Sequence, residues 1–209
     1  DPEAEGRLLA RAAAAAYGYS IGVWHSARYG ARNLVKFPLL LLVTTAVCAL
    51  ACFLTARLLT PKLAFRDVQN LVLRLYAAAS VLLASLAPVN LFLAATLVRP
   101  ASHGALNDYP LFLGLNVAFI AVSGSLALVK QASELLHRHR LGPWTSASLI
   151  CAWLALALAV GAQWAWYLRP FFGISAPGIQ GFCLGTQPDF RGATSFYEAV
   201  YHLVVPPGR

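Results

Sequence analysis

The sequence predicts an all-α fold: a polytopic transmembrane helix bundle of about five spans, followed by a C-terminal amphipathic interfacial helix. Hydrophobic residues make up 59% of the 209 residues and charged residues only 11%, a balance far from that of a soluble domain. Uncharged stretches of transmembrane length recur between short charged segments. A polar segment rich in glycine and proline then precedes one last amphipathic stretch.

The predicted spans are the uncharged stretches between charged residues, because about 20 apolar residues cross the hydrocarbon. These stretches are residues 12–27, 37–56, 75–98, 109–129 and 141–168. The first is the shortest, and it becomes long enough if Arg11 reaches the headgroups and the helix runs from Leu8 to His25. We therefore expect a five-span bundle at 1–168 and an extramembrane loop with an amphipathic helix at 169–209.

Small residues recur at a four-residue spacing in the first stretch. They are Ala10, Ala14, Gly18, Gly22 and Ser26. This spacing places them along one side of a helix and lets a second helix backbone approach closely. Ala14, Gly18 and Gly22 are therefore predicted helix-packing residues, and a dimerisation face is the alternative.

Neutral polar residues remain inside the predicted spans. They are Asn90, Asn116, Ser123, Ser125 and Gln163. We expect them to hydrogen-bond across helices. Pro88 interrupts the third span and predicts a kink whose freed carbonyl a neighbouring helix satisfies. The alternative interpretation of this set is a polar pathway for a solute.

The charges predict the orientation. Sixteen Lys and Arg against eight Asp and Glu give +8, and these charges stand at the ends of apolar runs. This pattern is typical of loops at anionic headgroups and argues against a nucleic-acid partner. Basic residues are slightly more numerous in the N-terminal segment and in the second and fourth loops, which predicts the N-terminus inside and the C-terminus outside. Residues 62–74, entered through Pro61, are expected to form an amphipathic approach to the third span.

The C-terminal region predicts an irregular loop and a capped helix. Residues 169–192 are rich in glycine and proline, and Ser195-x-x-Glu198 is a capping box. The helix that follows has one apolar face, made of Phe196, Tyr197, Val200, Tyr201 and Val204. We expect this helix to rest on the membrane surface or on the bundle, and a docking site for a partner subunit is the alternative.

No motif indicates catalysis, a metal or a cofactor. The four cysteines show no C-x-x-C spacing, and neither H-E-x-x-H nor a phosphate-binding glycine loop occurs. No acidic residue lies deep in a predicted span, which argues against intramembrane aspartyl proteolysis and most proton-coupled transport. We therefore predict no enzyme, and no catalytic, metal-binding or cofactor-binding residues.

Short motifs carry a resemblance. The acidic D-P-E start, and P-K-L-A-F-R-D at 61–67 leading into a proline-bearing span, resemble bacterial members of the Yip (Rab-interacting) multi-span superfamily. The tail motifs R-P-F-F-G at 169–173 and F-Y-E-A-V at 196–200 are similar to those of uncharacterised bacterial membrane proteins. The resemblance implies a five-helix fold without catalytic residues, and it makes Arg169 and Phe172 candidates for a packed corner.

These observations lead to two main hypotheses of function, and an enzyme acting at the membrane surface, with Arg138, His139 and an acid around a pocket, is a third. The first is a non-catalytic accessory or scaffold subunit of a larger complex in the bacterial cytoplasmic membrane, in contact with lipids and other integral membrane subunits. Its candidate interface residues are Arg169, Phe172, Phe196, Tyr197 and Tyr201. The alternative is a small-solute or lipid carrier or channel that uses Pro88, Asn90, Asn116 and Gln163.

Overall fold

The computed structural model describes residues 2–60, 63–97, 109–168, 194–198 and 201. Within these ranges the chain is helical and contains no strand. The helices are α1 (Pro2–Val23), α2 (Ala27–Leu59), α3 (Phe65–Thr96), α4 (Tyr109–Arg138) and α5 (Pro143–Tyr167). One helical turn follows at residues 196–198.

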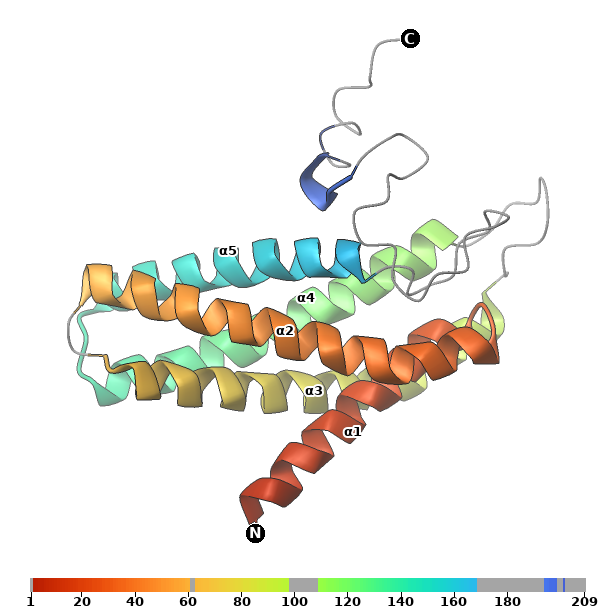
Figure 1. Ribbon diagram of the computed structural model, residues 1–209, viewed down its shortest axis with the longest axis horizontal. Helices are drawn as coiled ribbons and strands as arrows, with labels where there is room; N and C mark the ends of the chain where they lie inside the picture. Colours follow the sequence, from red (N-terminus) through yellow and green to blue (C-terminus); the bar gives the residue numbers. More distant parts are fainter. Residues whose placement is uncertain (1, 61–62, 98–108, 169–193, 199–200, 202–209) are drawn as a thin grey trace.

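The four helices α2 to α5 run along the long axis of the molecule, each antiparallel to the next in the chain (Figure 1). Helix α1 crosses them obliquely, and its N-terminal end projects away from the other helices (Figure 1). It packs on α2 and α3, while α5 packs on α2 and α4. The result is a bundle with α1 added at the end where the α1–α2 turn lies.

Four of these helices are long and apolar enough to cross a membrane: α2, α3, α5 and the Leu111–Arg138 part of α4. Large apolar side chains point outward along them, such as Phe92 and Leu126, which are 66% and 60% exposed. Such an exterior is suited to lipid. The chain is therefore an integral membrane protein. Helix α1 is not among the four, because Glu3, Glu5, Arg7 and Arg11 shorten its apolar stretch.

Several segments that were predicted as loops are helical. Helix α2 begins at Ala27, so Arg28, Arg32 and Lys36 lie on a helix and not in a loop. Helix α4 likewise continues to Arg138. The physical reason is that an uncharged run marks where a helix meets the headgroups, whereas the backbone can stay hydrogen-bonded beyond that level.

Two predicted helix starts and ends also change. The first helix ends at Val23, short of His25, because Ser26 caps the next helix by accepting from the Tyr29 N–H at 3.4 Å. The amphipathic approach at 62–74 is not a separate element, since α3 begins at Phe65 and runs on without a break. Pro61 lies outside the described residues.

The interior forms two main apolar clusters. One joins α2, α3, α4 and α5 around Trp153, whose Nε1 donates to the Cys52 carbonyl at 3.1 Å and to the Thr55 hydroxyl at 3.0 Å. The other lies where α1 packs and contains Tyr17, Phe37 and Leu83. A smaller cluster beside it stacks Trp24 on Phe112 with ring centroids 4.8 Å apart. Helix α1 therefore contributes side chains to the core.

Candidate functional site

A closed set of hydrogen bonds joins α1, α3 and α4. Its members are Tyr17 and Ser20 on α1, Asn90 on α3 and Asn116 on α4, all 0% exposed, and we call them the amide cluster. The Tyr17 hydroxyl donates to Asn116 Oδ1 at 2.9 Å, and Asn116 Nδ2 donates to Asn90 Oδ1 at 2.9 Å. Asn90 Nδ2 then donates to Ser20 Oγ at 3.0 Å, and Ser20 Oγ donates to the Tyr17 carbonyl at 2.7 Å.

The amide cluster satisfies its own polar groups. Asn116 also donates from Nδ2 to the Phe112 carbonyl at 2.9 Å, so both its amide oxygen and its amide nitrogen have partners. Polar groups in an apolar interior are costly when unpaired and hold helices together when paired. The cluster therefore binds α1 to α3 and α4. It offers little hydrogen-bonding capacity for a passing solute.

Helix α2 packs directly against the row of small residues on α1. A Cβ built on Gly18 would lie 2.5 Å from the Asn33 carbonyl oxygen, and one on Gly22 would lie 2.6 Å from the Gly30 nitrogen. Ala14 on the same helix is fully buried in the apolar cluster around Tyr17. In the folded chain, Gly18 and Gly22 thus have no room for a helix of another protein.

Lys36 takes a position that the sequence did not indicate. The sequence placed it in a loop, but its side chain is 1% exposed and Nζ donates to the Leu168 carbonyl at 3.2 Å. Leu168 is the C-cap of α5, where free carbonyls concentrate negative partial charge. The buried ammonium therefore ties the N-terminal part of α2 to the end of α5.

Residues 194–198, which we call the tail turn, lie against α5 (Figure 1). Tyr197 donates its hydroxyl to the Ala159 carbonyl at 2.7 Å, and the Phe196 N–H donates to Gln163 Oε1 at 3.3 Å. Trp166 Nε1 donates to the Thr194 carbonyl at 3.0 Å. Gln163 thus serves the tail turn and is not brought together with Asn90 and Asn116.

The expected capping box forms with one change. The Glu198 N–H donates to Ser195 Oγ at 3.2 Å, as a capping box requires. The Glu198 carboxylate accepts from the Thr194 N–H at 2.7 Å, one residue earlier than the Ser195 N–H that the motif specifies. The tail turn is therefore held both internally and on α5.

Beyond the tail turn, α5 exposes a row of small residues. Ala147, Cys151 and Ala155 are all exposed, and their four-residue spacing leads on to Ala159, the residue that Tyr197 contacts. We call the three exposed residues the α5 stripe. Only Leu149 and Trp153 of this helix are fully buried. Its spacing is the same as that of the small residues on α1, and hydropathy alone did not distinguish it in the sequence.

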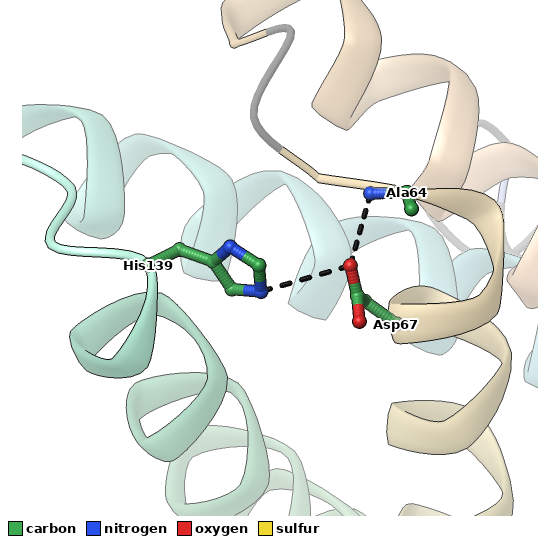
Figure 2. A network of polar contacts seen from close by, with 3 residues as sticks. All are labelled: Ala64, Asp67 and His139. Carbon is green, nitrogen blue, oxygen red and sulfur yellow. Dashed lines mark hydrogen bonds and ion pairs between the residues drawn. The ribbon is translucent and has the colours of Figure 1, made fainter.

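At the opposite end of the bundle, a polar contact links the α4–α5 loop to α3. Asp67 Oδ2 accepts from the Ala64 N–H at 3.0 Å and lies 3.6 Å from His139 Nε2 (Figure 2). Asp67 thereby covers a free N–H at the start of α3. Within the described ranges, no group of three or more His, Cys, Asp or Glu residues could hold a metal ion.

The remaining predicted residues are distributed as follows. Ser123 is buried on α4, and α3 continues through Pro88, where the kink stays a prediction. Phe196, Tyr197 and Tyr201 keep between a third and two thirds of their surface exposed. Arg169, Phe172, Val200 and Val204 lie outside the described residues. Tyr17, Ser20 and Lys36 are contributors that sequence reasoning missed, because neither hydropathy nor spacing distinguishes them.

Together these features define a polytopic α-helical membrane protein whose polar side chains join helices. No protein-family model matches the chain, and no curated protein or solved structure matches it. The resemblance to the Yip superfamily accordingly stays a prediction.

Proposed function

We propose that this chain is a non-catalytic integral membrane subunit that packs through the α5 stripe against another membrane protein of a larger complex. The observation that carries the proposal is the exposure of Ala147, Cys151 and Ala155 in one row on a helix. Lipid chains are as apolar as leucine, so helices associate in membranes through close packing at small residues. A row of this kind facing lipid is suited to a second helix.

The chain itself illustrates how such a row is used. On α1, the small residues Gly18 and Gly22 allow the α2 backbone to come into direct contact. On α5, the same kind of row is occupied at one end by Tyr197 and is open from Ala155 to Ala147. The open part supports a partner helix that continues the contact made by the tail turn.

We further propose that α1 is a fifth span, which places the N-terminus inside and the C-terminus outside. The amide cluster supports this arrangement because it ties α1 to two spanning helices through Asn90 and Asn116. Arg11 is exposed, so its long side chain can reach the headgroups while the helix remains in the hydrocarbon. The positions of the cations, described below, support the same orientation.

A carrier or channel is the alternative, and the contacts favour it less. A solute path needs polar groups that can exchange partners, whereas Asn90, Asn116, Tyr17 and Ser20 are bonded to one another away from any exposed surface. Gln163, the third amide of that hypothesis, accepts a hydrogen bond from the Phe196 N–H of the tail turn.

The proposal is tested by mild-detergent purification from the native membrane, with mass spectrometry of all co-migrating proteins. The unmodified chain should carry a larger membrane protein in fixed stoichiometry. Ala155→Phe should release this protein, because a bulky side chain keeps the two backbones apart. Leu126→Phe is the matched control, since it enlarges an exposed side chain on α4. Purification of the unmodified chain alone would contradict the proposal.

A further inference from the structure

An exposed cation stands at the same end of the apolar stretch of each of the four spanning helices, on the helix itself or in the adjoining loop. Arg57 follows the stretch of α2, Arg74 precedes that of α3, Lys130 follows that of α4 and Arg140 precedes that of α5. The ends of α2 and α4 and the starts of α3 and α5 meet at this end of the bundle (Figure 1). We call these four residues the boundary cations.

The boundary cations differ from Lys36, which closes the apolar stretch of α2 at the other end. Lys36 is buried and bonded to the end of α5. Arg74, Lys130 and Arg140 are exposed and make no ion pair with an acid in the part of the chain that the structure describes. Asp67, a nearby acid, is already in contact with His139. Positive charge at this end is therefore available to an external ligand.

Arg140 adds an independent indication. Its φ is 49°, the left-handed region, and it closes α4 with two turn bonds: Leu141 N–H to the Leu136 carbonyl at 3.2 Å and its own N–H to the His137 carbonyl at 3.0 Å. Glycine is the usual residue here, and a residue with a Cβ costs about 1 kcal/mol more. A glycine stands two positions later, at Gly142. Strained residues of this kind are concentrated at functional sites.

Apolar side chains at the same end show which kind of ligand fits. Trp144 at the start of α5 and Leu58 near the end of α2 are each 86% exposed. An exposed indole beside cations is typical of the layer where headgroups meet hydrocarbon. A soluble acidic protein would leave Leu58 and Trp144 unexplained, whereas a lipid accounts for both the charge and the apolar surface.

We propose that the boundary cations, together with Trp144, bind the headgroups of anionic phospholipids. The guanidinium groups of Arg74 and Arg140 can each pair with a phosphate through two parallel hydrogen bonds, and the Lys130 ammonium can pair with one as a point charge. The acyl chains then lie along the exposed apolar faces of the spans. None of the boundary cations belongs to the α5 stripe, so their binding of lipid does not depend on the proposed function.

The test reconstitutes the full chain in nanodiscs of phosphatidylcholine with or without phosphatidylglycerol, and counts the lipids retained per protein by native mass spectrometry. The unmodified chain should be enriched in phosphatidylglycerol. The variant R74Q/K130Q/R140N should lose roughly fivefold in this enrichment for each cation removed, the equivalent of about 1 kcal/mol per charge. Arg28→Gln, at an exposed cation of the other end, is the control and should retain the enrichment.

Single substitutions at Arg140 distinguish the loss of its charge from an effect on folding. Arg140→Lys should keep the enrichment, whereas Arg140→Asn should reduce it and still fold, because asparagine tolerates the left-handed conformation. Equal enrichment in the triple variant and the unmodified chain would overturn the proposal. Displacement of the lipid by a soluble polyglutamate peptide would also overturn it in favour of an acidic protein, and displacement by inorganic phosphate in favour of a free anion.

Discussion

Asn116 contacts three parts of the molecule at once. It accepts from Tyr17 on α1, donates to Asn90 on α3 and donates to a carbonyl of its own helix. Removing its side chain leaves buried groups on two other helices without a partner, and this penalty usually exceeds the value of the bond itself. Asn116 therefore contributes to holding α1 against α3 and α4, beside the apolar packing of α1 on α2.

Asn116→Leu is expected to lower the free energy of unfolding by about 2 kcal/mol, since it breaks two interhelical bonds and leaves the Tyr17 hydroxyl unpaired. The measurement is denaturant titration in detergent micelles, followed by tryptophan fluorescence. Asn70→Leu provides the control, because Asn70 is exposed on α3 and should tolerate the change. A loss no larger than that of the control would show that the amide cluster does not stabilise the fold.

Gly18→Ala is expected to destabilise the chain by about 1–3 kcal/mol, because the added methyl group would overlap the Asn33 carbonyl and Phe37. Gly114→Ala is the matched change on α4, where a Cβ meets nothing within 4 Å. The control should be neutral or slightly stabilising, since alanine favours a helix over glycine. Both are read from thermal unfolding in the same detergent, and similar midpoints would argue against close α1–α2 packing.

At the scale of elements, the helices differ in how much of their surface the fold uses. Helix α2 packs directly on the small residues of α1, and Asn90 of α3 and Asn116 of α4 hydrogen-bond to its polar residues. Helix α5 has two fully buried side chains and keeps a row of small residues open. The element with the least internal packing is therefore the one best placed for contacts with another protein.

Cys151, in the middle of the α5 stripe, allows this to be tested in native membranes. In a chain whose only cysteine is Cys151, a thiol-linked photocrosslinker should form a discrete adduct with a larger protein. Cys48 and Cys52 are buried, so alanine at both positions and serine at Cys183 should leave the stripe intact. The same crosslinker at Leu126→Cys on α4 should give no discrete adduct. Equal crosslinking at both positions would indicate contact with lipid or with random neighbours.

At the scale of the whole molecule, the distribution of charge is asymmetric. The boundary cations are all exposed at the end where α2 joins α3 and α4 joins α5, while at the other end, among the described residues of the α2 start, Arg28 is exposed, Arg32 is half-buried and Lys36 is buried. Cations in short connections favour the cytoplasmic side. The fold therefore predicts that the α4–α5 loop is cytoplasmic and the α1–α2 turn is not.

This orientation is tested with single cysteines in a cysteine-free chain and a membrane-impermeant maleimide. Arg28→Cys should be labelled in intact cells, while Arg138→Cys should be labelled only after the membrane is opened. Both residues are exposed, so access to the reagent depends on the side of the membrane. The reverse pattern would invert the proposed topology.

The sequence by itself determined the all-α membrane class, the four long apolar helices, and the asparagines inside them. These are properties of single runs: an uncharged stretch crosses hydrocarbon whatever its neighbours are. Tertiary structure decided that α2 packs directly on Gly18 and Gly22 and that Lys36 is buried. It also decided that Gln163 accepts a hydrogen bond from the tail turn. Those outcomes depend on which helix faces meet. Small residues occur at the same spacing on α1 and α5, so their sequence does not indicate which of the two rows packs on another helix of the chain.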